Sequence, residues 1–420
     1  MPPVINMAAT ALNKLYKTVY LGKDLANQSK RKTPCYDSVV SKYDDFDGNM
    51  LEFPFNQDLN VSLGKSVTQA RSTATTSTFA RWQMTTPKEL RSIIQIDAQS
   101  MKRARKDLGA WLRLKQKEMN ENRDYLKMVL GGHAWWGDGA GDIAQVLSVA
   151  GGPPITSFTL VNKRDAVKFH LNQRLNFATV RTGGAPLGGA ADATRTIYKV
   201  TKINRKTGVI TVLNIQGAVH PTANDYVYLD SFYDGFPLGV TAFLTSADPG
   251  TGTIPGTLLG MDRTDDPTMK AGFRGDWQGS ISETAKALAA DMGQYFDSMD
   301  TTLWLSRYNW FRLEQEMESA GRVVRDQSAT AKFGVPGIVL QTPEGDVTVL
   351  SDPYCPSDAG FFLNSSTWEC HHLDPLIHIA DDDGLQALRM NDDDGIEIRF
   401  RSWSENICQR PFKNGRFAIV

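Results

Sequence analysis

The chain has 420 residues, of which 41% are hydrophobic and 22% are charged, a composition typical of ordinary globular proteins. Its 46 Lys and Arg side chains nearly balance its 47 Asp and Glu side chains, which excludes a uniformly basic nucleic-acid coat but not a locally basic face. It contains no run of 18 apolar residues and no basic-then-apolar leader, so we expect neither a membrane span nor a secretory signal.

Residues 1–48 are predicted to form an arm and not part of a core. Up to position 42 this segment carries seven basic side chains and only two acidic ones, Asp24 and Asp37, with few large apolar residues. We expect the arm to lie on a neighbouring subunit.

Residues 49–86 predict a long β-hairpin. One strand is expected where Leu59, Val61 and Leu63 alternate with polar residues, and the second run ends at Phe79, Trp82 and Met84. The small, polar segment 64–76 between them, with Lys65 near its start, forms the tip. An isolated hairpin is marginally stable in water and has open edges, so we expect it to dock on another chain. The candidate inter-subunit contacts are Leu59, Val61, Leu63, Lys65, Phe79 and Trp82.

Residues 87–130 predict one long amphipathic helix with Pro87 in its first turn, ending at Gly131-Gly132. One apolar stripe is expected to face a core. It comprises Met101, Ala104, Leu108, Trp111, Leu112, Met119, Leu126, Val129 and Leu130. The opposite side carries basic residues, together with Glu121 and Asp124. A solvated helix face is the plain interpretation; the alternative is a DNA-facing surface, with phosphate contacts from Arg103, Lys106, Arg113 and Lys117.

Residues 156–234 change to short β runs and indicate a small inserted β module. Strands are expected at 158–160, 167–169, 197–203, 209–213 and 226–229. The five residues 204–208 form a hairpin loop that ends in Gly208.

Residues 235–370 mix helices and strands. Ser280 and Glu283 match a capping box, which predicts a helix from Ile281 to Met292. A second short helix is expected around Leu313, and strands at 303–305, 338–341 and 347–350. In the tail, two antiparallel strands, one running from 396 towards Cys408 and one at 416–420, should pair with each other or lie under the long helix.

No residue pattern predicts catalysis, a cofactor or a resident metal. The Gly64-Lys65-Ser66 run lacks the earlier glycine of a phosphate loop, and the segment 139–144 lacks the preceding strand of a dinucleotide fingerprint. The acidic runs at 381–384 and 392–395 do not place ligands at calcium-loop positions, and Asp-Gly turns are the simpler interpretation. The spacing of paired ligands that is typical of zinc sites is also missing among the soft metal ligands near the C-terminus, which are Cys355, Cys370, His371, His372 and His378. No disulfide frame is expected either: Cys35, Cys355, Cys370 and Cys408 lie far apart and predict reduced, buried thiols of a cytosolic protein.

The order of these parts resembles the major capsid proteins of tailed bacteriophages with the Hong Kong ninety-seven fold. Short local motifs agree with the resemblance: Leu238-Gly239, the segment 259–263 followed by Pro267, the segment 304–312 and the ending 408–415. The resemblance implies an α+β fold with an N-terminal arm, an extended loop, a peripheral domain with a long spine helix, an axial domain and an inserted small β domain.

The resemblance also implies a domain plan and partners. The implied parts are the arm (1–48), the extended hairpin loop (49–86), the peripheral domain with its spine helix (87–155), the inserted β module (156–234), the axial domain (235–371) and return strands of the peripheral domain (372–420). The implied assembly is a homo-oligomer of hexamers and pentamers in a virion capsid, built in the host cytoplasm around non-specifically held double-stranded DNA. The implied partners are a separate scaffolding protein and a portal protein, with a cement or decoration protein as a further one.

Three alternatives stay open at this point. An encapsulin-type compartment would share the fold and enclose protein cargo. Another β-rich virion component, such as a tail or baseplate protein, would form rings or tubes. An enzyme of unrecognised family is disfavoured because no catalytic constellation survives inspection.

Overall fold

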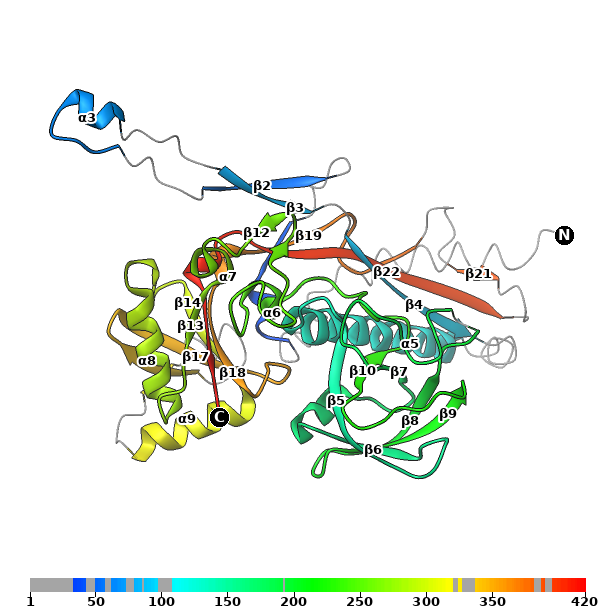
Figure 1. The fold of residues 1–420 in the computed structure, drawn as a ribbon. Helices are drawn as coiled ribbons and strands as arrows, with labels where there is room; N and C mark the ends of the chain where they lie inside the picture. Colours follow the sequence, from blue (N-terminus) through cyan, green and yellow to red (C-terminus); the bar gives the residue numbers. More distant parts are fainter. Residues whose placement is uncertain are drawn as a thin grey trace.

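The computed structural model describes residues 33–42, 50–56, 62–72, 79–84, 87–96, 108–191, 193–319, 324–326, 337–380, 387–389 and 395–420. Within these ranges no helix is both long and apolar enough to cross a membrane. Figure 1 shows a seven-stranded sheet with its helices on the left, a β-barrel at the lower right, and a long sheet above them. The calcium-like runs of aspartates at 381–383 and 392–394 lie outside the described residues.

The hairpin predicted near the N-terminus is present, and its second strand lies where expected, at Phe79–Met84, whereas its first strand lies earlier in the chain. β2 (Leu51–Asn56) and β3 (Phe79–Met84) pair antiparallel. The expected strand through Leu63 is wrong, because residues 62–64 have no regular structure. A short helix, α3 (Val67–Ser72), follows instead and lies at the far end of the hairpin, away from the rest of the molecule (Figure 1).

The long sheet has six strands arranged around β22 (Ile396–Cys408). Its longest pairing joins β22 to β4 (Lys88–Ile96), with Ile96 opposite Ile396 and Lys88 opposite Ser404. The other strands are β1 (Val40–Lys42), β19 (Trp368–His372), β20 (His378–Ile379) and β21 (Leu388–Arg389). β1 follows η1 (Tyr36–Ser38) and pairs parallel with β19, so this part of the arm lies on its own chain.

The long helix predicted to begin at residue 87 is wrong for residues 88–96, because these residues form the strand β4. Leu90, Ile94 and Ile96 are buried while the residues between them are exposed or half-buried, the period-two pattern of a strand with one buried face. The helix α5 spans Leu108–Met128.

Gly131 and Gly132 do not end the helix. α5 continues into a buried π-helical turn, η2 (Val129–Ala134), which contains both glycines. A Cβ atom at Gly131 would lie 2.8 Å from the Thr33 side chain, and one at Gly132 would lie 2.8 Å from the ring of Tyr354. The two glycines therefore allow Thr33 of the arm and the ring of Tyr354 to pack directly on the helix backbone.

The inserted module is a closed six-stranded barrel in the order β10-β5-β6-β9-β8-β7. Its strands are β5 (Asp142–Ala150), β6 (Ser157–Leu160), β7 (Arg174–Ala178), β8 (Ile197–Asn204), β9 (Val209–Gln216) and β10 (Tyr226–Leu229). The barrel includes β5, so it begins before the expected boundary at 156. The strand expected at 167–169 is wrong, because η3 (Lys163–Lys168) is a 3₁₀-helix there.

The seven-stranded sheet has the order β13-β23-β18-β14-β17-β16-β15. Its strands are β13 (Phe273–Gly275), β14 (Thr301–Ser306), β15 (Val324–Asp326), β16 (Gly337–Thr342), β17 (Gly345–Asp352), β18 (Ala359–Asn364) and β23 (Gly415–Ala418). α8 (Ile281–Met292) and α9 (Arg307–Ser319) pack on it through Leu288 and Leu313. The N-cap half of the predicted capping box is present, since Ser280 Oγ accepts from the Glu283 backbone amide at 3.2 Å.

The C-terminal strands do not pair with each other as expected. β23 pairs with β18 and β13 in the seven-stranded sheet, whereas β22 and β19 belong to the six-stranded sheet. The chain therefore crosses between the two sheets at η5 (Ser365–Thr367) and returns at η6 (Pro411–Lys413). The elements that remain are α6 (Val240–Phe243), the hairpin β11 (Thr257–Leu258) and β12 (Met261–Asp262), α7 (Pro267–Ala271) and η4 (Gly293–Tyr295).

Candidate inter-subunit contact site

The base of the β2–β3 hairpin is anchored within its own chain by Trp82. The Trp82 side chain is fully buried, with its ring 5.7 Å from that of Phe243 in α6 and 6.3 Å from that of Phe55. Met84, at the end of β3, is buried in the same core. The prediction of Trp82 as an inter-subunit contact is therefore corrected: an aromatic residue on a strand can face either way, and this one faces its own core.

The turn between β11 and β12 fixes the hairpin base a second time. The backbone amide of Gln83 donates to the backbone carbonyl of Leu259 at 2.7 Å. Leu259 and Gly260 both have positive φ, and a Cβ at Gly260 would lie 2.7 Å from Gln83 Oε1. The positive φ of residue 260 therefore favours glycine at this turn. On the exposed side of the hairpin, Arg81 pairs with Glu52 at 2.7 Å.

Arg263 holds the segment that carries this turn. Its guanidinium is fully buried and donates to the carbonyls of Ala242 at 2.7 Å and Pro255 at 2.9 Å. Burial lowers the pKa of Arg263 to about 10. This arginine of the 259–263 motif thus ties α6 to the β11–β12 hairpin, against which the projecting hairpin rests.

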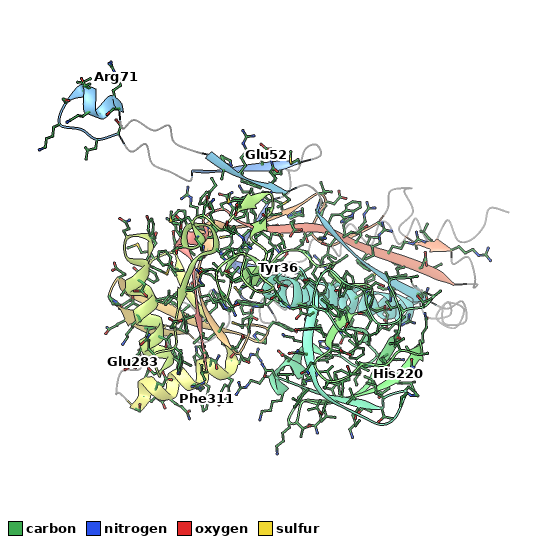
Figure 2. All side chains as sticks on the ribbon, in the orientation of Figure 1. Tyr36, Glu52, Arg71, His220, Glu283 and Phe311 are labelled. Carbon is green, nitrogen blue, oxygen red and sulfur yellow. The ribbon has the colours of Figure 1, made fainter. Side chains whose placement is uncertain are left out.

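The tip of the hairpin presents apolar side chains to solvent. Leu63 is 86% exposed and Val67 is 74% exposed, on either side of the exposed Lys65. Isolated helices shorter than about 12 residues are marginal in water, so the six-residue helix α3 gains little stability from its own hydrogen bonds. Figure 2 shows Arg71 at this same tip.

The other predicted contact residues are less fully described. Leu59 and Val61 lie outside the described residues, and Phe79 begins β3 but its side chain is not among those described.

The structure also gives little information on the predicted DNA-facing residues. Arg103 and Lys106 lie outside the described residues, whereas Arg113 and Lys117 lie within α5 with side chains that are not described.

Buried ionisable groups hold the junctions between the parts of the fold. Asp352, at the end of β17, accepts hydrogen bonds from the Tyr354 amide at 2.8 Å and the Cys35 amide at 3.4 Å, and its burial raises its pKa to about 7. Glu405, on β22, accepts from the Leu238 amide, and its burial raises its pKa to about 8. Each carboxyl accepts a hydrogen bond from the backbone of a segment distant in sequence, so both groups stabilise the fold.

A third buried group lies in the π-helical turn. His133 stacks on Phe236 with a centroid separation of 6.5 Å, and burial lowers the pKa of its imidazole to about 3. Among the described residues, no group of three or more His, Cys, Asp or Glu side chains could hold a metal ion. The four cysteines are unpaired and buried.

Sequence reasoning missed a basic surface on the barrel. The span from Asp142 to Leu229 carries ten Lys and Arg side chains but only four Asp side chains, in a chain of net charge −1. A count of charges by segment would have found it.

The fold of this chain is similar to the folds of several solved structures. The capsid asymmetric unit of cyanophage A-1(L) matches 93% of this chain and 93% of its own, with a TM-score of 0.50 and 11% identity. The capsid of the empty GTA particle matches 92% of this chain and 90% of its own, with a TM-score of 0.45 and 8% identity. A holo-SrpI encapsulin from Synechococcus elongatus matches 34% of this chain and 52% of its own, with a TM-score of 0.26 and 7% identity. The sequence matches no protein-family model and no curated protein. The chain therefore has the α+β fold of tailed-phage capsid subunits.

Proposed function

We propose that this chain is the major capsid protein of a tailed bacteriophage, which self-assembles into an icosahedral shell around double-stranded DNA. The observation that carries the proposal is the hairpin: its base is locked into its own subunit, while its tip, with Leu63 and Val67 exposed, lies away from the body. Such a tip is placed to reach an adjacent copy. The fold shared with the cyanophage capsid supports the same function.

The mechanism is assembly by many weak contacts. Each subunit touches several neighbours at once, so a closed shell is far more stable than any single pair of subunits. Closed symmetry also prevents the open filaments that head-to-tail contacts otherwise produce. In this proposal Leu63 and Lys65 contact a neighbouring copy, and Arg113 and Lys117 face the DNA. A separate scaffolding protein, a portal protein and assembly in the host cytoplasm complete the proposal, and a cement or decoration protein is a further partner it allows.

Electron microscopy of the purified protein, expressed with and without the proteins encoded beside it, tests the function. We expect closed icosahedral particles, and particles from infected cells should contain double-stranded DNA. A chain that stays monomeric at high concentration and with a scaffolding protein would refute shell assembly. Particles filled with protein cargo would identify a compartment of the encapsulin type, and open rings or tubes would identify a tail component.

A further inference from the structure

The outer surface of the barrel carries unneutralised positive charge beside exposed apolar side chains. Across the adjacent strands β7, β8 and β9, Arg174 lies opposite Lys199, and Lys199 lies opposite Leu213. The neighbours Leu175, Val200 and Val212 are buried inside the barrel, so these three side chains point outward. We call the outward surface of Arg174, Lys199, Lys202, Leu213 and Ile215 the barrel face.

The charges of the barrel face are not balanced within the described part of the chain. Arg174 and Lys199 are like charges at directly opposed positions, an arrangement that destabilises a sheet unless an anion lies nearby. Neither they nor Lys202 form an ion pair with a described residue. Leu213 is 59% exposed and Ile215 is 46% exposed. Apolar area flanked by charge is typical of a protein interface rather than of a phosphate-binding surface.

A surface of opposite charge lies on the other side of the molecule. Residues 276–319, which include α8 and α9, carry eight Asp and Glu side chains against three Lys and Arg. Glu283 and Glu318 are exposed, and the Phe311 ring is 49% exposed. We call this surface of Glu283, Phe311 and Glu318 the helix face.

Hydrogen bonds within the chain hold together the two helices that carry the helix face. Glu316 of α9 accepts hydrogen bonds from the Ile281 amide at 3.1 Å and the Ser282 amide at 3.2 Å, which brings the start of α8 to the last turns of α9. The helix face is therefore carried by two helices that are fixed to each other. Figure 2 shows Glu283 and Phe311 on one side of the molecule and His220, in the barrel, on the other.

We propose that the barrel face of one copy binds the helix face of the next copy around a ring of subunits. The partner is a second copy of this chain because the same molecule supplies both complementary surfaces, basic with Leu213 and Ile215 and acidic with Phe311. Two different faces on opposite sides produce a head-to-tail contact, which closes into a ring when the rotation between copies allows it. The proposal deepens the proposed function, on which it rests, by naming a contact within each ring of the shell.

Charge reversal with mixing tests the contact. The barrel-reversed variant K199E/K202E has two acidic faces, and the helix-reversed variant E283K/E318K has two basic faces. We expect each variant alone to lose shells in electron microscopy and sedimentation. An equimolar mixture should regain six-membered rings, in which the two variants can alternate so that every contact is complementary. Rings of five cannot alternate, so closed shells should return only in the chain that carries all four substitutions, K199E/K202E/E283K/E318K. The variant K163E/K206E makes the same change of charge at Lys206 in the β8–β9 turn and at Lys163 in η3 beside that turn, outside the barrel face, and should assemble as the wild type does.

Several outcomes would overturn the contact. These are normal shells from either reversed variant alone, no recovery on mixing, or an equal loss of shells in K163E/K206E. Unchanged circular dichroism of each variant shows that the fold is intact. A wild-type chain that forms no shells contradicts the proposed function instead. In that case sedimentation velocity still decides the contact, since the two reversed variants should associate with each other more strongly than either does with itself.

Discussion

The indole of Trp82, on the projecting hairpin, meets the ring of Phe243 in α6 edge to face, with the ring centroids 5.7 Å apart. Because Trp82 is fully buried, each subunit fixes the direction of its own hairpin before it meets another. The hairpin therefore has two parts with different roles. Its base stabilises the subunit, and its tip is available for contact with neighbours.

Replacing Trp82 with alanine should destabilise the subunit itself. Loss of a buried tryptophan typically costs about 3–5 kcal/mol, since it removes apolar contact and leaves a cavity. Chemical denaturation of the unassembled subunit measures the free energy of unfolding. Arg81→Ala, which breaks only the exposed pair with Glu52, should change it by less than about 1 kcal/mol. Equal effects of the two substitutions would contradict the anchoring role of Trp82.

Introducing charge at the tip should impair assembly and leave the subunit stable. Leu63→Asp and Val67→Asp alter exposed side chains, so the free energy of unfolding should change by no more than about 0.5 kcal/mol. A buried contact with a neighbouring copy would nevertheless be lost, and the yield of particles on a sucrose gradient should fall at least tenfold. Thr68→Asp places the same charge on α3 at the exposed polar position next to Val67 and is the matched control. Normal particles from both apolar-to-Asp variants would remove the tip from the assembly contacts.

Alanine at Gly132 should destabilise the protein, against the usual trend for helices. In an exposed helix, glycine to alanine stabilises by about 1 kcal/mol. Here the new Cβ would lie 2.8 Å from the Tyr354 ring, and such overpacking typically costs about 1–3 kcal/mol. Thermal unfolding compares this variant with Gly152→Ala, where no atom lies within 4 Å of the added Cβ. A rise in melting temperature for Gly132→Ala would show that Tyr354 can move aside.

Glu405 predicts a pH dependence of stability with a definite sign. Its pKa is about 8 in the fold and 4.5 ordinarily, so between these values the folded state keeps a proton that the unfolded state has lost. The free energy of unfolding from this group therefore falls as pH rises from about 4.5 to 8, by at most about 1.4 kcal/mol for each pH unit. Glu405→Gln cannot ionise and should gain stability relative to wild type across that window. Urea denaturation at pH 5, 6, 7 and 8 measures the difference, with the exposed Glu283→Gln as control; parallel curves for wild type and Glu405→Gln would refute the assignment.

Local patterns in the sequence predicted those elements whose determinants are local. The capping box at Ser280 located α8, and the alternation flanking the 204–208 loop located β8 and β9. The start of the spine helix was placed too early because Pro87 suits a helix start as well as a strand entry. The alternation of Leu90, Ile94 and Ile96 gave the opposite signal, and their partner strand β22 lies some 300 residues away in sequence.

The sequence likewise predicted some features of the candidate contact site and not others. The polar tip near Lys65 could be located from composition, since such a segment cannot make a core. The orientation of Trp82 could not, because it depends on Phe243, which belongs to a different part of the chain. The barrel face required the pairing of β7 with β8, which brings Arg174 beside Lys199.

The closed barrel has one more consequence, which concerns how such a protein can change. The chain enters the barrel at Asp142 and leaves just after Tyr228, and these two residues are partners in neighbouring strands. A closed ring of strands also leaves no unpaired edge to recruit other chains. The two connections between the barrel and the rest of the chain are thus adjacent. Another compact domain whose ends lie close together could therefore replace the barrel, in engineering or evolution, without changing the path of the remaining backbone.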